Sequence, residues 1–494
     1  MGGRNLAGVF GYDLLLAASV LFYAGVIAFY LRHPAAAFWH PVTIYLGFHG
    51  VVFVLRPILA RIFDYELLYR YAQFDPSVAD KINTILAANL ALAVFAFVAL
   101  WTSREPLEPH FDRQREALRT ALQVPVVLVG VLLAPLAFYA LIDQWTARAT
   151  DDFATTLDVA SGISYYSRGS GWVASANLMG APLCALFAWA FRFRWWTLVP
   201  FAAFAVLQGG TGGRGALVVA ALAIVILYLV ERRRRWPDWR SVAIIGVIFV
   251  AFTTIVADRG KAIREVFIED RAYISGGQYE TKPLEHMDFG NLEYTEFMVH
   301  TVPQRTGTYD YFAHTLQIFT EPIPRALWAD KPLGSPVKLF DLPDYGRPYG
   351  FTYAIPGIGW MSLGFPGVAI QAALFGLLYG WVHLMLVRRR ASPFALLAYA
   401  LMVAPTIVTF RDGTLLTIVR VLPFYMGPVL LLYGIARAGG IVDPLRWHVG
   451  ARRSADHKPI LQTPAPATSR AARARGAGRA TPAARRRALA AAER

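Results

Sequence analysis

Three arginines of this 494-residue chain lie in sequence settings that suggest a function, and the setting of Arg214 suits the binding of a phosphate group. Arg214 follows a turn at 209–213 made of four glycines and one threonine, and a new apolar segment begins directly after it. Glycines let a backbone approach a ligand closely, and the N–H groups at the start of a helix favour an anion. A guanidinium matches a pair of phosphate oxygens. The alternative is that Arg214 extends its charge to the edge of a membrane.

Arg411 and Arg420 lie just before and inside the last apolar segment. Nine helical residues rise about 13 Å, so Arg420 is expected within the membrane zone. An arginine in that zone is costly unless it has a partner or a function. The alternative is a structural ion pair: Asp412 is a candidate partner for Arg411, whereas the sequence places no obvious acid near Arg420.

A second group of candidates lies between residues 258 and 355. The spacing of Glu293, Glu296 and His300 predicts that they share one face of a helix, and Asp310 and His314 are expected on the next helix. Glu296, His300 and His314 are candidates for a general base, although such side chains are more often simply solvated. No HExxH or paired-cysteine pattern occurs, so no metal site is expected.

The segment 321–332 combines prolines with an aromatic residue and two cations. Trp328 is suited to stacking on a sugar, and Arg325 and Lys331 are suited to holding a diphosphate. The alternative is a turn packed on the helices. Arg305 and Tyr353 are further candidates for substrate binding.

Composition indicates what must position these residues. Hydrophobic residues make up 56% of the chain and charged residues 16%, whereas soluble proteins carry about 25% charged residues. Apolar blocks recur at lengths that suit membrane-spanning helices of about 20 residues. The sequence therefore predicts an all-α membrane bundle of about eleven helices. The single cysteine, Cys184, lies in an apolar run and is expected to be a buried small side chain. The expected spans are 12–31, 41–62, 83–101, 122–142, 172–191, 195–208, 213–231, 241–257, 356–386, 393–410 and 414–437.

Arginine-rich connections set the expected orientation. The loops 102–121, 232–240 and 387–392 and the C-terminal tail are basic, and all fall on one side of the predicted bundle, which is expected to be cytoplasmic. The N-terminus and the long loop 258–355 then lie outside. That loop is too long for a simple connector, and pieces at 291–301 and 309–319 are expected to be helical.

The predicted organisation has four parts. Residues 1–257 hold eight spans, 258–355 form the large periplasmic loop, 356–437 hold three spans, and 438–494 form a disordered basic tail. Residues 451–494 carry eleven Lys and Arg against two acids, a large share of the net charge of +15. On a membrane protein such a tail is better explained by topology or anionic lipid than by nucleic acid. No nucleotide-binding loop is present, and no cofactor is expected.

Three short stretches follow one another along the chain. They are the Gly-Gly-Thr turn before Arg214; Ile323-Pro324…Leu327-Trp328…Lys331-Pro332 followed by Pro356…Gly359…Gly364; and Arg411-Asp412-Gly413…Arg420. In this order they resemble the Wzy-type polymerases, membrane enzymes that join oligosaccharide repeat units of O-antigen, enterobacterial common antigen and related surface polysaccharides. The common-antigen polymerases have an Arg-Glu-Gly version of the third stretch.

The chain departs from the family pattern in two places. Two extra glycines precede Arg214, and the spaced Arg…Gly pair of some family members is not found, which leaves Arg347 without a role.

The resemblance implies a metal-independent glycosyltransferase in the bacterial inner membrane with its site facing the periplasm. The donor would be a glycan on undecaprenyl diphosphate, the acceptor a repeat unit on the same carrier, and a chain-length regulator a further partner. Arginines would stabilise the diphosphate that leaves.

Other functions remain as alternatives. An O-antigen ligase would use the same donor with lipid A–core as acceptor. A transporter of lipid-linked oligosaccharides would need many charged residues facing a cavity, whereas intramembrane charge here is sparse, with Arg56 and Arg420 the clearest cases. A non-catalytic assembly partner would not depend on the outer arginines.

Overall fold

The computed structural model divides the chain into two compact units, Met1–Val442 and Asp443–Arg494. All described residues belong to the first unit. The predicted span 241–257 and residues 443–494 of the predicted tail lie outside them, whereas residue 438, where the predicted tail begins, is still helical. The structure describes residues 6–107, 113–150, 157–158, 163–164, 173, 175–210, 215–239, 282, 284–285, 289–320, 323, 327–328, 340–346 and 351–442.

Helices dominate the described residues, in agreement with the predicted all-α class. The two strands, β1 (Leu157–Asp158) and β2 (Ile163–Ser164), form one short antiparallel pair. The helices of the first half are α1 (Leu6–Arg32), α2 (Pro41–His49), the π-helix η1 (Gly50–Leu55), α3 (Arg56–Phe63), α4 (Leu67–Ala72), α5 (Val78–Thr102), α6 (Arg113–Ala121), α7 (Gln123–Thr150), η2 (Ala176–Met179), α10 (Gly180–Ala190), η3 (Trp195–Leu198), α11 (Val199–Gly210) and α12 (Gly215–Glu231). Those of the second half are α15 (Asn291–Thr301), α16 (Ala313–Leu316), η5 (Gln317–Phe319), η6 (Leu342–Tyr345), α18 (Ala354–Arg388), α19 (Pro393–Val403), α20 (Thr406–Asp412) and α21 (Leu415–Ala438).

Seven helical stretches in the described part are long and apolar enough to cross a membrane. Three further apolar helices match predicted spans but are shorter, at 10–17 residues. These ten segments correspond to ten of the eleven predicted spans. The seven long stretches are Phe10–Arg32, Pro41–Phe63, Val78–Thr102, Gln123–Thr146, Ala354–Arg388, Pro393–Asp412 and Leu415–Ala438.

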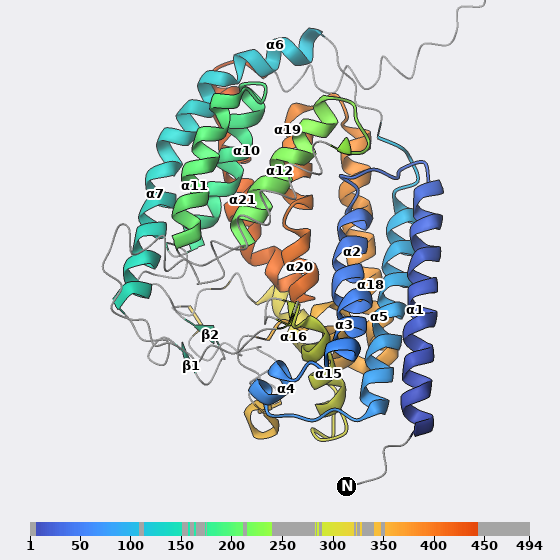
Figure 1. Ribbon diagram of the computed structural model, residues 1–494. Helices are drawn as coiled ribbons and strands as arrows, with labels where there is room; N and C mark the ends of the chain where they lie inside the picture. Colours follow the sequence, from blue (N-terminus) through green and yellow to red (C-terminus); the bar gives the residue numbers. More distant parts are fainter. Residues whose placement is uncertain are drawn as a thin grey trace, which may run out of the picture. The chain divides into compact units, whose positions relative to one another are not determined.

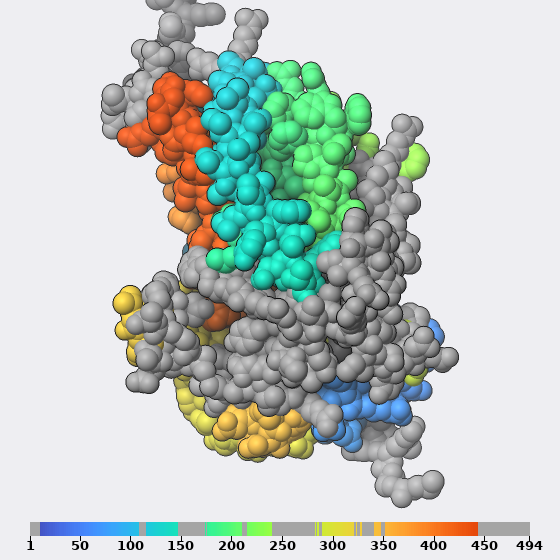
Figure 2. Space-filling view, turned by 90° about the vertical axis from the view of Figure 1, so that its left-hand side faces the viewer, coloured from blue at the N-terminus to red at the C-terminus, as the bar shows by residue number. Residues whose placement is uncertain are grey.

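Small residues bring α18 close to α5, and the two helices run side by side in Figure 1. A Cβ added at Gly376 would lie 2.9 Å from Cβ of Val98, and one at Gly380 would lie 2.6 Å from Cβ of Thr102. Glycines four residues apart allow this close approach, which compensates for the weak hydrophobic drive between helices in lipid. On another face, α7 lies between α21 and the group of α10 to α12 (Figure 2).

The helix α18 is broken near its start. Leu363 and Gly364 have non-helical backbone angles, and Gly364 has φ +61°, which favours glycine. A Cβ on Gly359 would lie 2.5 Å from Cα of Val368, although these residues would be about 13 Å apart along a straight helix. The segment 354–362 therefore folds back on the rest of α18. Residues 365–388 alone rise about 36 Å, enough to span a bilayer.

The chain after α15 closes this break. The N–H groups of Asp310 and Tyr311 donate to the carbonyls of Met361 and Ser362, at 3.1 Å each. These carbonyls lose their helical partners at the break and would be costly to bury unpaired. The predicted helix at 309–319 is therefore only partly correct: Tyr311 and Phe312 have positive φ, and the helix begins at Ala313.

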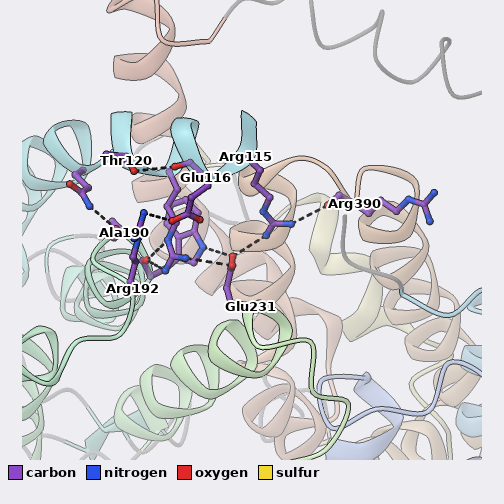
Figure 3. A network of polar contacts seen from close by, with 10 residues as sticks. Arg115, Glu116, Thr120, Ala190, Arg192, Glu231 and Arg390 are labelled. Carbon is purple, nitrogen blue, oxygen red and sulfur yellow. Dashed lines mark hydrogen bonds and ion pairs between the residues drawn. The ribbon is translucent and has the colours of Figure 1, made fainter. Parts of the chain in front are cut away.

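One end of the bundle, called here the basic end, gathers three of the predicted basic loops. Arg115 of α6 donates to Glu231 at the end of α12, at 2.9 Å, and to the carbonyl of Arg390 after α18, at 3.3 Å (Figure 3). Arg119 lies 3.5 Å from the same carboxylate. The opposite end, which carries α4, α15 and the starts of α1 and α5, is called the loop end (Figure 1).

Candidate functional site

The helix α15 is fixed to the bundle by a buried ion pair. Nε of Arg56 donates to both carboxylate oxygens of Glu293, at 2.8 and 3.0 Å, and the two side chains are 0% and 1% exposed. Arg56 also donates to the carbonyl of Leu284 and lies over the ring of Tyr65. The intramembrane arginine noted in the sequence therefore has a structural partner in the large loop.

Glu296 lies on the same face of α15 as Glu293, as its spacing predicts. The hydroxyl of Tyr69 donates to its carboxylate at 2.6 Å, and Glu296 is 1% exposed. Burial raises the pKa of Glu296 to about 7; nearby Lys81 opposes the rise and Glu293 adds to it. Its burial and its tyrosine partner suit a role in docking α15.

The two candidate histidines also have carboxylate partners. Nδ1 of His300 lies 2.9 Å from a carboxylate oxygen of Asp80, at the start of α5. Nδ1 of His314 is bonded to Asp310, and its Nε2 lies 3.2 Å from the hydroxyl of Thr315. The predicted His300 therefore reaches the N-terminal half of the chain, whereas His314 stays within its own loop segment.

Arg411 lies at the end of α20, where the chain turns sharply into α21. Gly413 ends α20 with φ +73°, and its N–H donates to the carbonyl of Thr409 at 2.8 Å. A Cβ at Gly413 would lie 2.0 Å from the carbonyl oxygen of Ala354, so only glycine fits against the start of α18. Nε2 of Gln371 donates to the Gly413 carbonyl at 2.8 Å. The turn is thus held rigidly against α18.

The guanidinium of Arg411 is bonded at one nitrogen. Its Nε donates to the hydroxyl oxygen of Thr352 at 3.3 Å. Among the described residues, neither terminal nitrogen of Arg411 has a hydrogen-bond or ion-pair partner. Arg411 is partly exposed, so its terminal nitrogens are the groups best placed to receive an anion.

Asn291 connects this turn to the large loop. Its side-chain Nδ2 donates to the carbonyl of Arg411 at 2.9 Å and to Thr352, where one hydrogen is shared between the hydroxyl oxygen, at 3.0 Å, and the carbonyl. Asn291 is 1% exposed. Sequence reasoning missed Asn291 and Thr352, since neither an isolated amide nor an isolated hydroxyl forms a motif.

Arg420 lies two turns into α21 and is exposed. The hydroxyl of Thr417 donates to Asp412 at 2.9 Å, and Asp412 lies within electrostatic reach of both Arg411 and Arg420. The expectation that no acid stands near Arg420 is therefore wrong. The helical turn from Asp412 into α21 brings them together, which linear separation in the sequence conceals.

The remaining candidates differ in how exposed their side chains are. Arg305 is exposed and its carbonyl accepts from the Tyr345 hydroxyl at 3.2 Å, while Trp328 is 39% exposed. Tyr353 is 4% exposed, packed among the aromatic side chains beneath α15. Arg214, Arg325 and Lys331 lie outside the described residues.

The start of α12 bears on the Arg214 prediction. Gly215, which follows Arg214 in the chain, lies against α20: a Cβ there would be 3.7 Å from Cγ2 of Val408. Val408 is one helical turn from Arg411. The start of α12 therefore lies against the helix that carries Arg411.

An apolar groove of about 640 Å³ lies between α7 and α10. It is lined by Gly130, Ala134 and Phe138 on α7 and by Leu183 and Phe187 on α10, among others. Ala140, on another face of α7, packs in a separate buried cluster with Ala176 and Phe424, one turn from Arg420.

The apolar helices and their packing indicate a membrane protein. Comparison with protein families, with curated proteins and with solved structures finds no match to this chain. In the described part, no three His, Cys, Asp or Glu side chains converge as a metal site would require. The function is therefore argued from the arginine turn alone.

Proposed function

We propose that the protein is a membrane glycosyltransferase of the Wzy type, which polymerises oligosaccharide repeat units carried on undecaprenyl diphosphate. The acceptor hydroxyl attacks the anomeric carbon of the donor glycan, the bond from that carbon to the diphosphate breaks, the hydroxyl proton passes to solvent, and undecaprenyl diphosphate leaves. The reaction takes place at the loop end, which in this proposal faces the periplasm.

The observation that carries the proposal is the state of Arg411. Its Nε is held by Thr352, its backbone is held by Asn291, and its terminal nitrogens are unpartnered among the described residues. A guanidinium fixed in this way is prepared to bind two oxygens of one anion. Negative charge that develops on a leaving diphosphate is stabilised best by donors that are already in position.

Two further features support a lipid-linked anion as the ligand. Arg420 lies close to the same turn, and Gly215, the residue after Arg214 in the sequence, lies against α20. The apolar groove between α7 and α10 is a surface of the kind that a polyprenyl chain would occupy.

The proposal gives no catalytic role to Glu296 or His300. Glu296 is buried against Tyr69, and His300 is paired with Asp80. Both contacts join the loop to the first half of the chain, so these side chains are better explained as docking residues for α15.

The test is incubation of the purified protein with undecaprenyl-diphosphate-linked repeat units, with and without lipid A–core. A ladder of products without lipid A–core, lost in Arg411→Ala, is expected. Product that forms only with lipid A–core would make the protein a ligase instead. Absence of any product would exclude both and favour transport or assembly.

A further inference from the structure

The bonds around Arg411 form a relay from the large loop to the guanidinium. Asn291, on the first turn of α15, donates to Thr352, and Thr352 accepts from Arg411. A hydroxyl oxygen has two lone pairs, so Thr352 accepts from both donors at once. The three residues come from three separate segments of the chain, which meet at this point.

We infer that Thr352 and Asn291 are positioning residues that aim the Arg411 guanidinium at a diphosphate. This inference rests on the proposed function. A long arginine side chain has many rotamers, and a bond at Nε fixes the plane of the guanidinium while leaving its terminal edge open. That edge is the one that makes paired bonds to phosphate oxygens.

Burial separates Asn291 from the other two residues of the relay. Asn291 is 1% exposed, Thr352 is partly exposed and Arg411 is partly exposed. The amide of Asn291 also donates to the Arg411 carbonyl. Asn291 therefore fixes the backbone of Arg411 and also the Thr352 hydroxyl, which orients the Arg411 side chain. Neither Asn291 nor Thr352 needs to touch the substrate.

The inference predicts a particular kinetic signature. Thr352→Val keeps the shape of the side chain and removes the acceptor, while Thr352→Ser restores it. Loss of one hydrogen bond to a charged group corresponds to about tenfold or more in rate. Because the diphosphate gains charge as it leaves, kcat should fall while KM for the donor changes little.

A double-variant comparison separates positioning from general stability. If Thr352 acts through Arg411, adding Thr352→Val to Arg411→Ala should cost nothing further. If Thr352 only supports the fold, the two losses should multiply. Thr306→Val is the matched control, since the Thr306 hydroxyl donates to the Thr308 carbonyl in the same loop and is not bonded to Arg411.

The experiment measures polymer formation and, separately, binding of undecaprenyl diphosphate to the full-length protein in detergent. We expect Thr352→Val to lower kcat and weaken diphosphate binding, each about tenfold, with Thr352→Ser near the wild type. A Thr352→Val protein that equals the wild type in both readouts, or losses that multiply with Arg411→Ala, would overturn the inference.

The binding readout keeps the two proposals distinct. If the wild type makes no polymer but binds undecaprenyl diphosphate in a Thr352-dependent manner, the proposed function fails and the positioning role stands. If the wild type does not bind undecaprenyl diphosphate, the positioning role fails whatever the polymer assay shows.

Discussion

The two ends of the helical bundle both bury charged side chains, and they pair these charges differently. At the loop end each acid of α15 has its own partner: Glu293 has Arg56 and Glu296 has Tyr69. At the basic end, Arg115 and Arg119 share the single carboxylate of Glu231. Each acid of α15 therefore has a partner of its own, one cationic and one neutral, whereas at the basic end two cations share one acid.

At the basic end, neutral groups help the shared carboxylate to stabilise the two arginines. Arg119 donates from Nε to the carbonyl of Trp189 at 2.8 Å, and its guanidinium lies 5.3 Å from the centre of that indole ring. Trp189 in turn donates from its indole N–H to Glu231 at 2.9 Å. Carbonyls and aromatic faces stabilise a cation without cancelling its charge.

The pairing at the loop end explains why the acids of α15 do not bind Arg411. The acids of α15 are already occupied by partners from the N-terminal half, so they are not available to neutralise it. Asp412 lies within electrostatic reach of Arg411 but is hydrogen-bonded to Thr417, so the guanidinium of Arg411, at a rigid turn, is expected to serve a ligand. The following changes would break or sharpen this comparison.

The largest effect is expected at the basic end. Glu231→Ala leaves two buried arginines without their carboxylate and should lower the free energy of unfolding by about 3–5 kcal/mol. Thermal unfolding in detergent measures the loss. Glu116→Ala is the control, since its pair with Arg192 is about half exposed and should contribute less than about 1 kcal/mol. Equal losses in the two variants would contradict the shared-carboxylate interpretation.

At the loop end, Glu293→Ala leaves one buried arginine unpaired. The expected loss in the free energy of unfolding is again about 3–5 kcal/mol, towards the lower value because Arg56 keeps the Leu284 carbonyl. The matched control is Arg61→Ala, which breaks the exposed pair with Asp13 and should cost less than about 1 kcal/mol. A Glu293→Ala protein as stable as the control would show that the buried pair does not dock α15.

Arg411→Ala should lower polymer formation by a factor of about 10²–10³, the usual effect of removing one donor from a developing oxyanion. Because Arg411 is not part of a matched pair, its thermal unfolding should stay close to that of the wild type. Arg437→Ala, at the other end of α21, serves as the control. Arg411→Lys should restore little, since an ammonium does not make paired bonds. A large fall in stability would mean that Arg411 is structural.

Glu296 predicts a dependence of stability on pH. Its pKa in the fold, about 7, lies above the ordinary value of 4.5, so the fold favours the protonated form. This contribution is complete below pH 4.5 and is lost as the pH rises through 7, up to about 3 kcal/mol. Glu296→Gln keeps an acceptor for Tyr69 and should flatten the dependence. An unchanged pH profile in this variant would contradict the assignment.

Hydropathy predicted the long helices well, because twenty apolar residues have few other arrangements in lipid. Pro41–Phe63 and Leu415–Ala438 match their predicted spans almost residue for residue. The break in α18 could not be predicted in the same way. Residues on both sides of Gly364 are apolar, and only the contact of Gly359 with Val368 reveals that the chain folds back.

The sequence predicted several residues of the candidate site but not the partners that these residues contact. Helical spacing placed Glu293 and Glu296 on one face, but it could not indicate that the face is turned inwards against Arg56 and Tyr69. Those partners lie more than 220 residues away in the chain. Asn291 was invisible for the same reason, since its role depends wholly on where Thr352 and Arg411 meet.

The fold-back in α18 has a consequence for dividing the protein into parts. Residues 310 and 311 complete the backbone bonding of residues 361 and 362, and Trp360 donates to the carbonyl of Val302 at 2.8 Å. The large loop and the start of the following span therefore share one hydrogen-bonded unit. A chimera that exchanges loops between related chains should keep its function only when the junction is placed after residue 365, so that the donor supplies both sides of the fold-back.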